Sequence, residues 1–265
     1  MTAYKCLLYE VKDAIATLTL NRPDRLNALG DTLRDDLPRR GAACQRRRGG
    51  PRDGDHRRGQ GLLLRRRRQG DERGQGVRRR ASDGEKVAPL RDRVLLAMRD
   101  APQPIIAAVN GAAAGAGMNL ALGCDIRLAS TAARFGETFA RRGLHPDWGG
   151  TYFLPRLVGM AKAAELIFTG DMIDAAEALR LGIVSALHSP EELMPATYDL
   201  ARRDRRGAAG GHPPRQAGAL PQPETDLRGG LEFETFAQNI CFETEDAREG
   251  IRAFVEKRPP QFKGR

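Results

Sequence analysis

The stretch from Arg39 to Arg80 limits what this 265-residue chain can fold into more than any other feature. Its 42 residues include 16 arginines, four acidic residues and no aromatic residue, which gives a net charge of +12. Only seven of these residues are apolar. Such a composition buries too little apolar surface to offset the entropy that is lost on ordering. We therefore predict that residues 39–85 are disordered and that the fold is built from the rest of the chain.

The excess charge of the chain comes from this window, because the whole chain carries +10 and the residues outside it sum to −2. A second unusual window covers residues 202–223, which lack aromatic residues and any helical period. We divide the chain into a core of residues 1–201 and a C-terminal helical region of residues 202–265. Arginine runs bind phosphate without specificity, but no aromatics are interleaved and no nucleic-acid motif is present. A specific nucleic-acid partner is therefore not expected.

Several other classes of protein are excluded by short features of the sequence. The four cysteines lie far apart and form no CxxC pair, which argues against a disulfide scaffold or a metal cluster. Residues 1–10 lack the apolar core of a secretory signal, so a cytoplasmic location is expected. Residues 105–126 are weakly apolar, but Asn110, Asn119 and Asp125 interrupt them, so a membrane span is not expected.

Strand and helix patterns alternate along the chain, which is typical of the α/β class. A β-hairpin is predicted over Tyr4–Leu20, and a Gly/Ala loop is predicted over Gly111–Gly117. The predicted strands are Ile105–Val109, Ile126–Ala129 and Ile183–Val184. The predicted helices are Asp31–Leu37, Val87–Arg99, Met118–Leu122, Ala161–Phe168, Asp174–Leu181, Leu231–Ile240 and Asp246–Lys257.

The Gly/Ala loop is a candidate anion site because it follows a buried strand and opens a helix. Small residues let a ligand approach the backbone closely. The first turn of a helix presents N–H groups without helical acceptors, together with a favourable dipole. The alternative is that the small residues only allow tight packing between helix and strand.

Four stretches together resemble one family. They are NRPDRLNAL (21–29), AAVNGAAAGAGMNLALGCDIRLAS (107–130), RRGLHPDWGGTYFLPRLVG (141–159) and REGIRAFVEKRPPQFKGR (248–265). These motifs and their order resemble the crotonase superfamily, the enoyl-CoA hydratase/isomerase group. The resemblance implies an α/β fold with a spiral core of β-β-α turns and C-terminal helices that make oligomer contacts. It also implies an acyl-CoA substrate, no metal or redox cofactor, and a homotrimer or hexamer.

The resemblance disappears in the two unusual windows. In the first, the family pattern calls for a strand followed by a motif like GRGFCSGADV. A two-base frame shift can convert the codons of that motif into QGLLLRRRR, which is the sequence of residues 60–68. The same shift turns LAKRALYRS into residues 215–223. We hypothesise that both windows are out-of-frame translations of a GC-rich gene, and resequencing the gene tests this.

The resemblance implies an oxyanion hole for the thioester enolate. One N–H group is expected from Ala116, flanked by Gly115 and Gly117, and removal of such a donor typically costs about 3 kcal/mol of barrier. The second donor position falls at about Arg66 in the shifted frame. Arg25 and Leu26 are expected to line the entrance for CoA.

The resemblance implies that hydration would use two glutamates, one after the Gly/Ala loop and one three residues after Gly136. In this chain these two positions hold Asn119 and Phe139. Glu137 is offset by two residues from the second position and does not occupy it. Straightforward water addition therefore lacks both expected acid/base groups.

Asp147, in HPDWGG, is the remaining catalytic candidate. It matches a lone Asp of the ring-epoxide/oxepin-CoA isomerases of phenylacetate breakdown, the branch that the pattern resembles most. Burial against Trp148 and Phe139 would raise its pKa toward the working range. In the alternative interpretation Asp147 only stabilises the turn, and His145 is a surface residue.

The expected function is therefore enoyl-CoA isomerisation by a single Asp, with Asn119, Phe139 and Trp148 lining the acyl pocket. An enoyl-CoA hydratase and a catalytically inactive scaffold of the same fold remain open, and an arginine-rich nucleic-acid binder is the weakest alternative. The acyl group of the substrate is not predicted.

Overall fold

The computed structural model describes residues 7–21, 61–66, 84–101, 103–205 and 227–263. The predicted helix at Asp31–Leu37 and the predicted entrance residues Arg25 and Leu26 lie outside these ranges.

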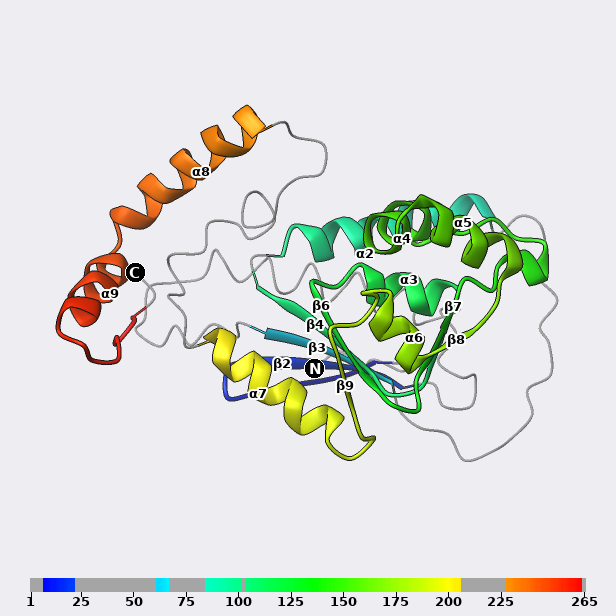
Figure 1. Cartoon of the computed structure of the whole chain (residues 1–265), viewed down its shortest axis with the longest axis horizontal. Coiled ribbons are helices and arrows are strands. Elements are labelled where there is room, and N and C mark those ends of the chain that lie inside the picture. Colours follow the sequence, from blue (N-terminus) through cyan, green and yellow to red (C-terminus); the bar gives the residue numbers. More distant parts are fainter. Residues whose placement is uncertain (1–6, 22–60, 67–83, 102, 206–226, 264–265) are drawn as a thin grey trace.

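The largest element is a six-stranded sheet in the order β1-β2-β3-β4-β6-β9 (Figure 1). Its strands are β1 (Leu7–Lys12), β2 (Ile15–Leu20), β3 (Gly61–Arg66), β4 (Ile105–Val109), β6 (Ile126–Ser130) and β9 (Ala186–His188). The hairpin β1–β2 is antiparallel, and every other neighbouring pair is parallel. The chain turns between β1 and β2 at Asp13 and Ala14, so the predicted hairpin is confirmed.

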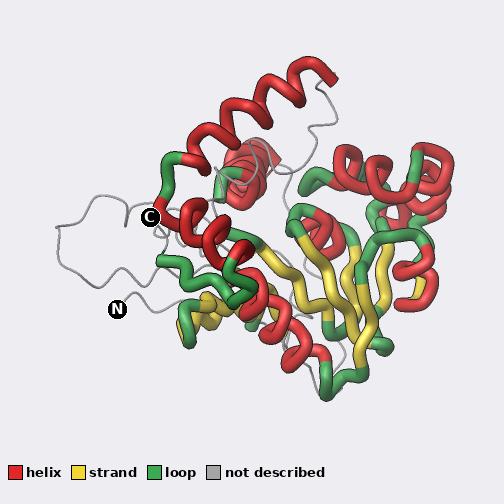
Figure 2. Tube along the Cα trace, turned by 60° about the vertical axis from the view of Figure 1, so that its left-hand side comes forward, coloured by secondary structure: helices red, strands yellow, loops and turns green. Residues whose placement is uncertain are grey.

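Strand β4 shows why the sheet is covered on both faces. Ile105 and Ala107 pack into one buried cluster, and Ile106 and Ala108 pack into clusters on the opposite side. This alternation is the period of two of a strand, and a strand that is apolar on both faces belongs in a covered parallel sheet. The helices that cover it are α2 (Gly84–Arg99) and α3 (Ala116–Leu122) on one face and α7 (Leu193–Arg205) on the other (Figures 1 and 2).

The prediction of disorder across residues 39–85 is wrong at two places. Gly61–Arg66 forms β3, which pairs in parallel with β2 on one side and with β4 on the other. Helix α2 begins at Gly84, just inside the same window. An average composition over the whole window conceals the apolar run Leu62–Leu64. In addition, the neighbouring strands β2 and β4 can form hydrogen bonds with the backbone N–H and C=O groups of a strand of almost any sequence.

A second, smaller sheet has the order β5-β7-β8. Its strands are β5 (Ala112–Ala114), β7 (Arg134–Gly136) and β8 (Ile173–Asp174). Beside it lie α4 (Gly150–Val158), α5 (Met160–Thr169), α6 (Ala175–Arg180) and the 3₁₀ turn η4 (Ala140–Arg142). A second buried cluster centred on Met118, Phe135, Leu154 and Ile183 joins this sheet to the helices.

Two predicted elements differ from the structure. The predicted loop Gly111–Gly117 contains strand β5, which pairs with β7. The predicted strand Ile183–Val184 is absent, because both N–H groups donate to the Ala178 carbonyl oxygen at the end of α6. The strand of this region is β9, which begins at Ala186.

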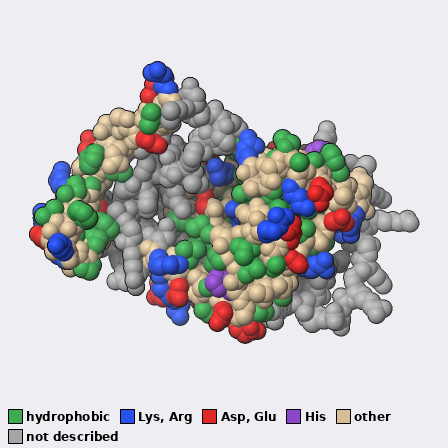
Figure 3. All heavy atoms as spheres, in the orientation of Figure 1, with side chains coloured by type: hydrophobic (Ala, Val, Ile, Leu, Met, Phe, Trp, Pro, Cys, Tyr) green, Lys and Arg blue, Asp and Glu red, His purple; other side chains and the backbone are tan. Residues whose placement is uncertain are grey.

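The described part of the C-terminal region contains the expected helices α8 (Leu227–Phe242) and α9 (Glu245–Val255). The expected boundary after residue 201 is wrong, because α7 continues to Arg205 and its last turn lies in the second unusual window. Thr244 caps α9 by accepting a hydrogen bond from Ala247 N at 3.0 Å. The two helices extend away from the sheet (Figures 1 and 2). Hydrophobic side chains are exposed along them, including Phe236, Ile251 and Phe254 (Figure 3). Among the described residues, no helix has the length and apolar character needed to cross a membrane.

Candidate active site

The Gly/Ala segment leaves the large sheet at the end of β4 and enters the small sheet before it becomes helix α3. Gly115 N donates to the Gly136 carbonyl oxygen at 2.8 Å, which ties this segment to β7. Gly115 has a φ of +53°, and a Cβ there would lie 3.4 Å from the Phe139 ring. Glycine therefore allows both the backbone conformation and the close approach of Phe139.

Helix α3 starts at Ala116 directly after this turn. Its fourth N–H group, that of Asn119, donates to Gly115 O at 3.0 Å. The N–H groups of Ala116 and Gly117 precede it and have no acceptor within the helix. The first turn of α3 contains no charged residue, and its N–H groups and the helix dipole favour an anionic oxygen.

Arg66 is the last residue of β3, where the expected second N–H donor was placed. Its neighbour Arg65 is opposite Ala108 of β4, so the carboxyl ends of the two strands meet at one edge of the sheet. The Gly/Ala segment leaves from the same edge after Val109. The backbone of Arg66 thus lies in a strand, and not in a loop that follows one.

Asn119 lies at the centre of a polar cluster inside the molecule and is fully buried. Its side-chain amide Nδ2 donates to Glu137 Oε2 at 3.3 Å and to the backbone carbonyl of Asp147 at 2.7 Å. Gly150 packs directly on this amide, since an added Cβ would lie 2.6 Å from Asn119 Oδ1. Asn119 therefore joins α3, the segment after β7 and the turn before α4.

Glu137 is the residue of this cluster that the sequence did not single out for chemistry. It is fully buried, and its Oε1 atom accepts no hydrogen bond from the described residues. The pKa of Glu137 is raised to about 7. Burial raises it most, the hydrogen bond from Asn119 lowers it, and repulsion from Asp147 also raises it. A buried acid with a pKa near neutrality is typical of functional sites. The sequence feature that could have identified Glu137 is an acidic residue between Phe135 and Phe139, in a segment whose aromatic residues suit a buried core.

Asp147 lies in the turn before α4 and is half-buried, with its Oδ1 atom screened from solvent. Its backbone carbonyl accepts from Asn119 Nδ2 and from Gly150 N at 3.3 Å. The next residue, Trp148, has a φ of +53°, which is unusual for a non-glycine residue. Gly149 follows at +73° and occupies the N-cap of α4. Strained backbone of this kind, beside a buried polar cluster, is common at functional sites.

The structure thus brings together Ala116, Gly117, Asn119 and Asp147, with Phe139 against Gly115. The Trp148 ring is 2% exposed and packs with Leu120 and Met98 in the main core, so its expected role as a pocket wall stays a prediction. His145 is exposed, with Nδ1 2.7 Å from the Pro146 carbonyl oxygen, as the surface interpretation expects.

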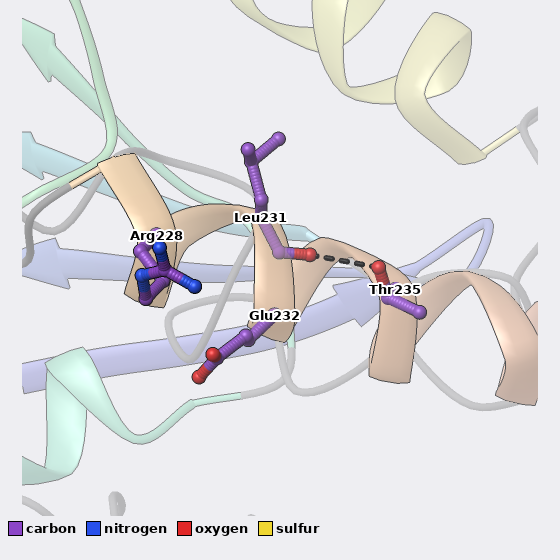
Figure 4. Close-up of a pocket in the computed structure, with 4 residues that line it drawn as sticks. All are labelled: Arg228, Leu231, Glu232 and Thr235. Atoms are coloured by element: carbon purple, nitrogen blue, oxygen red, sulfur yellow. Dashed lines mark hydrogen bonds between the residues drawn. The ribbon is translucent and has the colours of Figure 1, made fainter.

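The rest of the described chain contains no candidate metal site. No group of three or more His, Cys, Asp and Glu residues there could hold a metal ion. A pocket of about 510 Å³ lies on α8, lined by Arg228, Leu231, Glu232 and Thr235 (Figure 4). The Thr235 hydroxyl donates to the Leu231 carbonyl at 2.8 Å, which is a bond within the helix. This pocket shares no residue with the cluster around Asn119.

Comparisons with known proteins agree with this architecture. A family model described as enoyl-CoA hydratase/isomerase matches residues 71–265. The 1,2-epoxyphenylacetyl-CoA isomerase of Escherichia coli is 35% identical, over 98% of this chain and 98% of that protein. The crotonyl-CoA hydratase of Syntrophomonas wolfei is 38% identical, over 69% of this chain and 70% of that protein.

Solved structures match as well. The crystal structure of an enoyl-CoA hydratase/isomerase from Cupriavidus metallidurans superimposes with a TM-score of 0.83 at 29% identity. That match covers 100% of this chain and 98% of the other. The fold is therefore of the crotonase type, and the chain belongs to the enoyl-CoA hydratase/isomerase family of enzymes.

Proposed function

We propose that this protein is an enoyl-CoA isomerase in which Asp147 carries the proton. The observation that supports it most directly is the position of Asp147, half-buried and fixed through its backbone to Asn119 of α3. The same helix begins with the N–H groups that would receive an anionic oxygen. A hydrogen bond thus ties the proton carrier to the helix whose first turn provides the anion site.

In the proposed reaction, the Asp147 carboxylate removes a proton from C2 or C4 of the acyl chain, where the thioester acidifies the C–H bond. The electron pair of the broken C–H bond moves into an enolate, whose oxygen accepts a hydrogen bond from the N–H of Ala116. Asp147 then returns the proton to a different carbon of the enolate. The backbone N–H of Arg66 is proposed as the second donor to the oxygen, and Arg25 and Leu26 as part of the CoA entrance.

Enoyl-CoA hydratase is the second candidate. Water addition needs two acid/base groups, and the cluster contains two carboxyl groups, Glu137 and Asp147. The S. wolfei relative is named a crotonyl-CoA hydratase, which also supports hydration. A catalytically inactive scaffold is the third candidate, because Asn119 and Phe139 stand where the resemblance places the two glutamates.

A panel of enoyl-CoA esters separates the candidates. Isomerisation of the double bond without uptake of water is expected for the wild-type protein. Asp147→Asn should lower kcat by at least about 10²-fold while CoA-ester binding is kept. Hydration alone would favour the second candidate, and binding without turnover would favour the third.

The proposal extends to assembly as a homotrimer or hexamer in the cytoplasm. The apolar side chains of α8 and α9 support self-association, because Phe254 is 85% exposed and Val255 73% exposed. Exposed apolar patches of this kind mark interaction surfaces.

A further inference from the structure

Glu137 is a buried ionisable group of this site that the proposed reaction does not use. It follows strand β7, whereas Asp147 comes from the turn before α4. Both are held by one amide group, because Asn119 Nδ2 donates to the Glu137 carboxyl and to the Asp147 backbone. Their charges interact, since ionised Asp147 disfavours ionisation of Glu137. The charge on Asp147 therefore influences whether Glu137 is ionised.

The surroundings decide which of the two keeps the proton. Glu137 is completely buried, and its side chain accepts a long hydrogen bond of 3.3 Å from Asn119. Asp147 is half-buried and can be solvated in part. Burial penalises the charged form of Glu137, so Glu137 keeps its proton up to about pH 7.

Cations of the surrounding elements are engaged elsewhere. Helix α3 has no ionisable residue. Arg142 donates to the Thr138 hydroxyl at 3.0 Å, and Arg141 pairs with Asp171. Arg156 of α4 donates to the Tyr152 carbonyl, and Lys162 of α5 pairs with Glu165. The charge that acts on Glu137 is thus that of Asp147.

We propose that Glu137 is a positioning residue, linked through the Asn119 amide to the Asp147 backbone, and that the carboxyl pair Glu137 and Asp147 carries a single negative charge in the active enzyme. This proposal rests on the proposed function, in that Asp147 is the base. Protonated Glu137 leaves the charge on Asp147 and adds none of its own. When Glu137 ionises, a second negative charge in the same buried cluster opposes formation of the enolate.

The test is the pH dependence of kcat/KM for the wild type and for Glu137→Gln, which mimics the protonated acid. Wild-type kcat/KM should fall about threefold or more between about pH 6 and pH 8, and Glu137→Gln should lack this fall. Glu165→Gln, on the exposed side of α5, should keep the wild-type profile. A uniform loss of rate in Glu137→Gln, with the wild-type pH profile, would overturn the proposal.

A second measurement is independent of turnover. Infrared spectroscopy of the wild type should show a carboxylic-acid C=O band that disappears near pH 7 and is missing in Glu137→Gln. In Asp147→Asn the midpoint of this band should move to lower pH, because the like charge is gone. An unmoved midpoint or an absent band would refute the carboxyl pair, even if Glu137→Gln does not fold. If the wild type turns over no ester but the band behaves as expected, the proposed function fails and the carboxyl pair stands.

Discussion

At the scale of single residues, the site depends on one amide that three segments share. Asn119 holds the Glu137 carboxyl and the Asp147 backbone, and its amide occupies the space that a Cβ at position 150 would need. A displacement of about 1 Å at such a centre can change a rate by about 10²-fold. Small changes at Gly150 should therefore lower kcat.

Gly150→Ala should reduce kcat by about 10²-fold, because the new methyl group would overlap the Asn119 amide and shift it away from Asp147. The free energy of unfolding should fall by about 1–3 kcal/mol from the same crowding. Steady-state kinetics and urea denaturation measure the two effects. Gly230→Ala, where an added Cβ meets nothing within 4 Å, is the matched control and should leave kcat unchanged.

Glu137 should also make stability depend on pH. Its pKa is raised to about 7 in the folded protein, so the folded state binds the proton more tightly than the unfolded state. The stabilisation is complete below the unfolded pKa of about 4.3 and is lost as the pH rises through about 7. The loss amounts to about 4 kcal/mol at most.

Chemical denaturation at a series of pH values measures this loss. In Glu137→Gln the corresponding decrease should disappear, because glutamine does not titrate. Equal decreases in the two proteins would contradict a buried, proton-binding Glu137.

At the scale of elements, the short helix α6 in the second core relies on its N-cap. Helix α6 has six residues and buries Ala175 and Ala178, and Asp174 accepts a hydrogen bond from Glu177 N at 2.8 Å. A short helix gains little from its own hydrogen bonds, so the cap and the packing hold it in place.

Asp174→Ala should lower the free energy of unfolding by about 1 kcal/mol, since an N-cap side chain is lost. For a protein of this size the melting temperature should fall by about 2–4 °C. Asp199→Ala removes an exposed aspartate of α7 that pairs with Arg202, and it should change Tm by less. Differential scanning calorimetry compares the two.

Much of the site was predictable from the sequence, because its main features are local. The start of a helix after glycines and the Asp147 turn both depend on neighbouring residues. Glu137 was not nominated because its role comes from a contact with Asn119, 18 residues away, and not from its position in a motif. Strand β3 was missed for a similar reason, since its partners β2 and β4 come from distant parts of the chain.

At the scale of the whole molecule, α8 and α9 stand apart from the sheet and expose apolar side chains (Figures 1 and 3). An isolated pair of helices buries little surface, so we expect it to find its partner in another copy of the chain.

Phe254→Asp should therefore shift the protein toward the monomer, because a charge replaces a side chain that is 85% exposed in the single chain. Light scattering coupled to gel filtration measures the mass. Met160→Asp, on α5, replaces an apolar residue that is 74% exposed and should leave the mass unchanged. A monomeric wild type would contradict the proposed assembly.

The place of β3 in the sheet has a consequence for how errors in a gene are tolerated. Hydrogen bonds between strands use main-chain atoms, which are the same for all residues except proline, and residues 60–68 contain none. A scrambled reading frame can thus occupy the gap between β2 and β4 and keep the scaffold closed, while the side chains that recognise a substrate are replaced. Architecture and activity can therefore be lost separately in this chain.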